Sequence, residues 1–142
     1  SLTILAQAEN ATDICSNVDF ATMASPGSWV VNPDWAAQHS DVLVRFNRAM
    51  FKAMDFASAA TTDDAVAQEV AGYVAKITGL DVESTIAQRY DGSWLNSAQV
   101  LEMIESGKLV EYYNNQQVNF GDAAGPLKAE EFVLVDLMVN AK

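Results

Sequence analysis

Residues 40–60 read SDVLVRFNRAMFKAMDFASAA and decide the fold class, because their apolar side chains recur at the spacing of an α-helix. The apolar positions follow the i, i+4, i+7, i+8 rule. This predicted stripe consists of Val42, Phe46, Ala49, Met50, Ala53, Met54 and Ala57. The other face carries Arg45, Arg48, Lys52 and Asp55. The segment therefore predicts an amphipathic helix that Ser40 caps and that ends near Ala60.

The residues before this helix combine a short helix with β-capable runs. Asn32 is expected to cap a helix over Pro33 to His39, because proline is tolerated at a first helical position, where its missing N–H costs nothing. Leu2–Leu5 and Ser28–Val31 are typical of strands, and the second run follows a Ser-Pro-Gly turn. Two strands alone are marginal in water, so we expect them to pair with something else.

The residues after this helix are predicted to be helical throughout, in shorter pieces. The expected segments start at 61–64 and end near Gly79, then cover 81–89, 96 to about 106, 109 to about 120, and 128–140. In the first of them the buried side is assigned to Val66, Val70, Tyr73, Val74 and Ile77. We therefore expect a chain that is mainly helical after Asn32, with strands chiefly before it.

The composition narrows the classes of partner. The chain has 142 residues with 19 acidic and 8 basic side chains, a net charge of −11. This length is typical of one domain with a sizeable core. The acidic balance argues against nucleic acid and against anionic membrane surfaces, which attract clustered lysine and arginine. The longest apolar run, Phe132 to Val139, is too short to span a bilayer.

No set of residues indicates catalysis, a metal or a cofactor. His39, Ser40 and Asp41 are consecutive, so their side chains cannot align as a hydrolytic triad, and capping is the better interpretation. One histidine and one cysteine leave no zinc-ligand set. The acidic pairs at 63–64 and 130–131 open helices and complement their dipoles. We therefore expect neither an enzyme nor a metal or cofactor site.

The three tryptophans differ in their surroundings. Trp35 is expected in the core, and Trp94 is expected to anchor a loop. Trp29 lies where a Pro-Gly turn enters a β-capable run, a position from which the ring can face a cleft or pack in the core.

Residues 28–46, SWVVNPDWAAQHSDVLVRF, resemble a stretch of periplasmic solute-binding proteins of the taurine, sulfonate and nitrate type. In that family a "WVV" strand precedes an aromatic-containing helix, a His-Pro-Asp/Glu junction and a long helix. Ser40 stands here in place of the family's proline. Residues 94–99, 120–121 and 131–133 are similar to later parts of the family pattern, so the resemblance extends over nearly the whole chain.

The resemblance implies an α/β fold of the type II periplasmic-binding class, with solute held between two lobes. It implies that this chain is only the C-terminal part, mainly α-helical with few strands. Residues 1–27 then end the second lobe, and residues 28–142 form a crossing segment and the C-terminal helices of the first lobe. The missing N-terminal half supplies the partners for the orphan strands, and the isolated fragment is expected to form oligomers.

The implied function is the solute-binding component of an ABC importer, which captures a small anionic solute by lobe closure and docks on a membrane permease. The implied location is periplasmic or extracellular, either free or anchored as a lipoprotein. The expected ligand-binding residues are Gly27, Ser28 and Trp29. Some taurine-type relatives carry an acidic residue two places before this tryptophan, so Gly27 disfavours an amino-sulfonate.

Two other functions stay open. The same two-lobed fold serves as the effector-sensing domain of transcription regulators, which a DNA-binding motif in a longer chain would indicate. A free-standing helical interaction domain is the other, with its acidic surface providing solubility.

Overall fold

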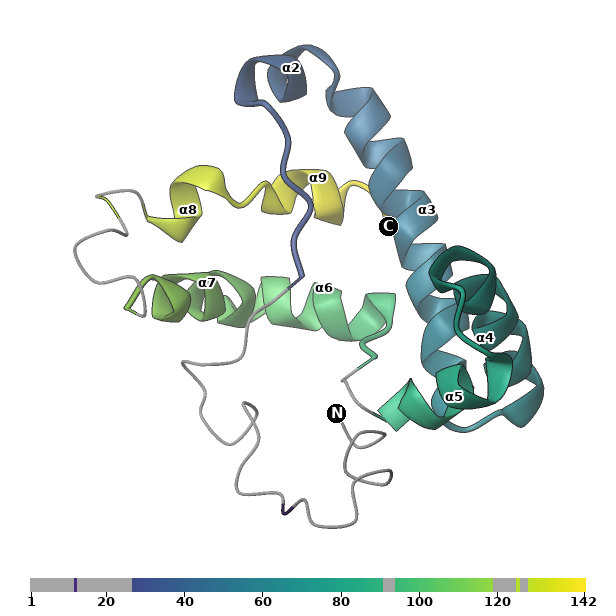
Figure 1. The fold of residues 1–142 in the computed structure, drawn as a ribbon. Helices are drawn as coiled ribbons and strands as arrows, with labels where there is room; N and C mark the ends of the chain where they lie inside the picture. The colour runs from purple at the N-terminus through teal and green to yellow at the C-terminus, as the bar shows by residue number, and fades with distance from the viewer. Residues whose placement is uncertain (1–11, 13–26, 91–93, 119–124, 126–127) are drawn as a thin grey trace. The chain divides into compact units, whose positions relative to one another are not determined.

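The computed structural model describes residues 12, 27–90, 94–118, 125 and 128–142 (Figure 1). Most of these residues are helical, and the described ranges contain no strand, which confirms the mainly helical prediction for this part of the chain. The strand expected over Ser28–Val31 is wrong, because residues 27–32 form neither helix nor strand. A strand needs a neighbour for its backbone hydrogen bonds, and no described segment offers one. Leu2–Leu5 lies outside the described residues.

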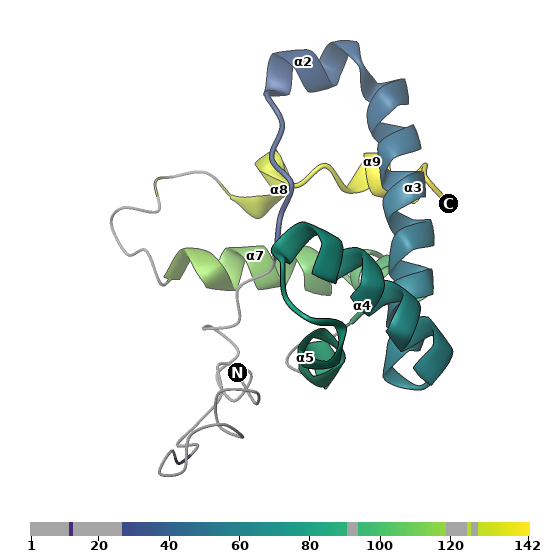
Figure 2. The same cartoon turned by 45° about the vertical axis from the view of Figure 1, so that its right-hand side comes forward.

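The chain forms two compact units, which we describe separately. The first includes Phe51–Ser97, and the second includes residues 27–50 with Ala98–Lys142. The boundary falls inside the long helix α3, Ser40–Ser58, which is drawn in blue in Figures 1 and 2. The lobe boundary expected at residue 27 concerns a larger protein and stays a prediction.

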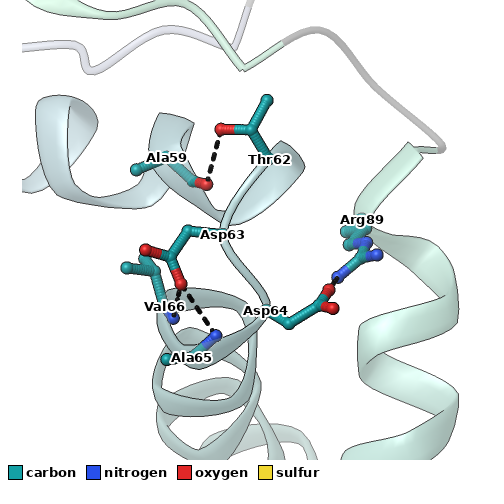
Figure 3. Close-up of polar contacts among 7 residues, drawn as sticks. All are labelled: Ala59, Thr62, Asp63, Asp64, Ala65, Val66 and Arg89. Atoms are coloured by element: carbon teal, nitrogen blue, oxygen red, sulfur yellow. Dashed lines mark hydrogen bonds and ion pairs between the residues drawn. The ribbon is translucent and has the colours of Figure 1, made fainter.

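In the first unit, short capping contacts define the helices. The end of α3 continues into the 3-10 helix η2, Ala59–Thr61, and then into α4, Asp64–Thr78. Asp63 caps α4 by accepting hydrogen bonds from the N–H groups of Ala65 and Val66 at 2.9 and 3.2 Å (Figure 3). Gly79 ends α4 in the left-handed region, with φ of 75°, as the sequence predicts. These contacts agree with the helix boundaries expected from the sequence.

The first unit ends with α5, Val82–Ala87, and the 3-10 helix η3, Gln88–Tyr90. Helix α4 packs against both η2 and α5. Ala60, Ala67 and Ala71 are buried, because a methyl side chain lets helices approach closely.

The second unit contains α2, Pro33–Gln38, the start of α3, and four later helices. These are α6, Ser97–Glu105; α7, Lys108–Val118; α8, Ala129–Phe132; and α9, Val135–Val139. Gly107 separates α6 from α7 with a φ of 76°, which glycine adopts without strain. Helices α7 and α8 pack side by side, as both views show.

The single helix expected over residues 128–140 is wrong, because an inverse γ-turn divides it into α8 and α9. Leu134 has φ of −82° and ψ of 62°, and the N–H of Val135 donates to the carbonyl of Val133 at 2.9 Å. The β-branched Val133 and Val135 flank this turn, and such residues favour helices only weakly. An apolar run therefore does not guarantee a continuous helix.

The apolar stripe predicted on α3 is only partly covered. Val42 and Phe46 are exposed, whereas Phe51, on the opposite side of the helix, is buried. The same holds on α4, where Tyr73 and Ile77 are 53% and 87% exposed and the alanine face is buried instead. Periodicity identifies an apolar face, but what packs against the helix decides which face is covered.

We predict that Asp63→Ala destabilises the fold by about 1 kcal/mol, because α4 loses the acceptor for two N-terminal amides. Urea denaturation measures this change. Asp63→Asn is the matched control, since asparagine caps about as well as aspartate. Equal destabilisation by both substitutions would contradict the capping role.

A second prediction concerns pH. The backbone N–H of Ser84, and then its hydroxyl, donate to Asp81 and hold the pKa of this carboxyl below its ordinary value. Ionised Asp81 therefore stabilises the fold at any pH above its unfolded-state pKa. This contribution is lost as the pH falls through the lowered folded-state value.

Asp81→Asn should keep an acceptor for the Ser84 N–H but remove the titration. The melting temperature of the unsubstituted protein should exceed that of the variant at neutral pH. This difference should shrink as the pH falls below the unfolded-state pKa and through the lowered folded-state pKa of Asp81, because the carboxyl then becomes protonated. Circular dichroism melts at a series of pH values measure it, and a constant difference would contradict the linkage.

Candidate functional site

The three residues expected to bind solute lie in the segment that leads into α2. Gly27, Ser28 and Trp29 are all exposed, and Trp29 is 77% exposed. A Cβ at Gly27 would contact nothing within 4 Å, so this glycine borders open space. Trp29 therefore does not pack in the core of the described chain.

A cluster of side chains surrounds this segment, and we call it the Ser28 cluster. It consists of Ser28, Trp29, Phe46, Tyr113 and Phe132. The hydroxyl oxygens of Ser28 and Tyr113 lie 2.8 Å apart, a hydrogen-bond distance, and either can donate. The cluster brings together the segment before α2 and helices α3, α7 and α8.

Two edge-to-face ring pairs make up the apolar part of the Ser28 cluster. Trp29 meets Phe46 with ring centroids 5.5 Å apart and an angle of 81° between the rings. Tyr113 meets Phe132 at 6.3 Å and 87°. This geometry places the positive edge of one ring on the negative face of the other, so both pairs are favourable. The rings can therefore provide an aromatic wall beside the Ser28 hydroxyl.

Asn114 fixes α8 beside the cluster. Its side-chain oxygen accepts a hydrogen bond from the N–H of the fully buried Ala129 at 2.8 Å, and its amide nitrogen lies 3.3 Å from both carboxylate oxygens of Glu130. The pKa of Glu130 is lowered, first by its own backbone N–H, then by the Asn114 amide and the charge of Lys128. One side chain of α7 thus holds the first turn of α8.

Trp35 is not the core residue that the sequence suggested. It is 41% exposed and stacks on His39, with centroids 4.4 Å apart and nearly parallel rings. Its neighbour Ala36 is buried in its place, because the smaller side chain faces the packed side of α2. His39 Nδ1 lies 2.9 Å from the Trp35 carbonyl, and since a carbonyl only accepts, Nδ1 carries the proton.

The residues considered for catalysis have structural contacts. The Asp41 carboxylate pairs with Arg45 at 2.8 Å, and His39 caps the end of α2. Of the acidic pair that opens α4, Asp63 is the cap and Asp64 pairs with Arg89 (Figure 3). Arg89 has a raised pKa, chiefly because its guanidinium donates to Asp64.

The indole N–H of Trp94 donates to the carbonyl of Arg89, in η3, at 2.7 Å. The loop that Trp94 is expected to anchor, residues 91–93, lies outside the described residues.

In the described ranges no group of three or more histidine, cysteine, aspartate or glutamate side chains could hold a metal ion. No helix in the part of the chain that the structure describes has both the length and the apolar character of a membrane span.

Sequence reasoning missed Tyr113 as a neighbour of the expected site. It lies 85 residues after Ser28, in the stretch EYYNNQQ at 111–117, which carries no catalytic or ligand-binding motif. Only the tertiary structure brings the two hydroxyls together.

Comparison with known proteins adds no family assignment. No protein-family model matches this chain, and neither the curated proteins nor the solved structures contain a match.

Proposed function

We propose that this chain is the C-terminal portion of the solute-binding component of an ABC importer. In this proposal a small anionic solute, such as a sulfonate or nitrate, binds in a cleft between two lobes, and the segment Gly27–Trp29 forms part of its wall. The permease is the membrane partner, and the protein acts in the periplasm or outside the cell, free or as a lipoprotein. The chain binds and delivers the solute and catalyses no reaction.

The observation that carries this proposal is the exposed Trp29 beside a hydroxyl pair. Its ring is held at one edge by Phe46 and leaves most of its surface uncovered. Next to it lie the hydroxyls of Ser28 and Tyr113. An aromatic wall with a few placed hydroxyls is a common lining of small-molecule sites. Hydroxyl donors suit an anion, because they offer hydrogen bonds without a competing negative charge.

The uncovered apolar surface is the second support. Of the buried hydrophobic residues in the described ranges, all but Phe51 and Val100 are alanines. Large apolar side chains such as Val30 and Ile77 are instead exposed, at 93% and 87%. Large exposed apolar side chains fit the proposal that another chain covers them, because their contact with water is unfavourable. In the proposal the N-terminal half of the same protein covers it.

A free-standing helical interaction domain is the second candidate. The observation that favours it is the helical structure itself, since the described ranges contain helices without strands. Its apolar surface then serves a partner protein. The two candidates differ in what the chain does alone, because an interaction domain is a stable monomer and a half-protein is not.

We predict that the isolated 142-residue chain associates, because its exposed apolar side chains have no cover. Sedimentation velocity should show oligomers, and co-expression with the N-terminal half should replace them with a single 1:1 species. A cooperative, well-behaved monomer of the isolated chain would contradict the proposal and support the interaction domain.

We predict that Trp29→Ala in the full-length protein weakens solute binding at least tenfold. An aromatic side chain at the centre of a contact typically contributes about 2 kcal/mol or more, which corresponds to more than a factor of ten in Kd. Isothermal titration with nitrate, ethanesulfonate and taurine measures the affinity. Taurine should bind more weakly than ethanesulfonate, because Gly27 offers no carboxylate to its ammonium group.

Trp35→Ala is the matched control for this experiment. Trp35 stacks on His39 within the same unit, outside the Ser28 cluster. The control should lower the melting temperature and leave the affinity unchanged. If Trp29→Ala binds normally and melts much lower, Trp29 has a packing role and the site is misplaced.

A further inference from the structure

We propose that Tyr113 is a positioning residue of the solute site and acts through Ser28. This inference rests on the proposed function and adds a residue that the sequence did not indicate. In this inference the hydroxyl pair of Ser28 and Tyr113 helps to set the position of Trp29.

The segment that carries the proposed solute-binding residues lacks regular structure. Residues 27–31 belong to no helix or strand, so no regular ladder of backbone bonds determines their path. Side-chain contacts must then order the segment, and an ordered site binds better than a mobile one. The hydroxyl pair of Ser28 and Tyr113, 2.8 Å apart, ties the segment to α7.

Tyr113 is itself held in place by its helix and by contacts with α8. It lies in α7, and its ring packs edge-on against Phe132 of α8. The next residue, Asn114, binds the first turn of α8 through its side-chain amide. Helix α7 and its contacts with α8 therefore fix the Tyr113 hydroxyl, and a contact mounted on such an element positions its partner well.

Ser28 and Trp29 are consecutive residues, so a restraint on one also restrains the backbone of the other. The hydrogen bond restrains the Ser28 side chain and its backbone, and the next residue carries the exposed ring. The Trp29–Phe46 contact fixes only one edge of this ring. Loss of the Tyr113 hydroxyl should therefore loosen Trp29 without unfolding the unit.

The test compares Tyr113→Phe, Ser28→Ala and their double variant in the full-length protein, with Tyr112→Phe as the matched control. Tyr112 is the preceding residue of α7, so the control removes a hydroxyl from the same helix. Titration with nitrate and ethanesulfonate should show roughly three- to tenfold weaker binding for Tyr113→Phe. The control should bind normally. The melting temperature should hardly change, because phenylalanine keeps the ring contact with Phe132.

Two further readouts separate positioning from stability. In a background in which Trp35, Trp94 and any tryptophan outside these 142 residues are replaced by phenylalanine, Trp29 is the only tryptophan, and Tyr113→Phe should lower its fluorescence anisotropy and increase its quenching by acrylamide. The double variant should bind solute no more weakly than whichever single variant has the lower affinity. The reason is that both substitutions remove the same contact, the hydroxyl pair of Ser28 and Tyr113.

Unchanged affinity and anisotropy in Tyr113→Phe, with normal binding by the unsubstituted protein, would overturn the inference and leave the proposed function standing. Additive losses in the double variant would also overturn it. If the unsubstituted protein binds none of the anions, the proposed function fails, and the role of Tyr113 in a solute site fails with it.

Discussion

Each helix of this chain depends on satisfying the backbone groups at its ends, because the first N–H and last C=O groups of a helix have no partner within it. Side chains next to the helix serve this purpose at several starts. Asn32 accepts from the N–H of Trp35, Asp63 from two amides of α4, and Asp81 from that of Ser84. With a core made largely of alanine, these local bonds define where the helices begin.

At two other helix starts, the backbone N–H groups donate to side chains that are distant in the sequence. The Asp55 carboxylate, on α3, accepts hydrogen bonds from the backbone N–H and the hydroxyl of Ser97 at 2.7 and 2.9 Å, at the start of α6. The Asn114 side chain accepts from the N–H of Ala129 at the start of α8. Such bonds cap one helix with a residue of another, so they join secondary and tertiary structure in one interaction.

The Ser28 cluster also joins segments that are distant in the sequence. A pair of hydroxyls connects a segment without regular structure to α7, and this segment carries an aromatic ring that stays exposed. The apolar surfaces of α3 and α4 are exposed as well. The polar side chains of this chain thus make local contacts, while many of its large apolar side chains are exposed.

The sequence by itself determined where the helices lie. Caps, helix-ending glycines and apolar spacing are local signals, and they placed α2, α3, α4 and α5 within a residue or two. Tertiary structure alone decided which faces are covered, because Phe51 and the small Ala67 and Ala71 are buried while Val42 and Tyr73 are not. Tertiary structure also decided that Ser28–Val31 forms no strand, because these β-capable residues have no neighbouring strand among the described residues. It likewise decided the position of the turn at Leu134. The meeting of Ser28 with Tyr113 joins residues 85 apart, and no local pattern encodes a contact at that separation.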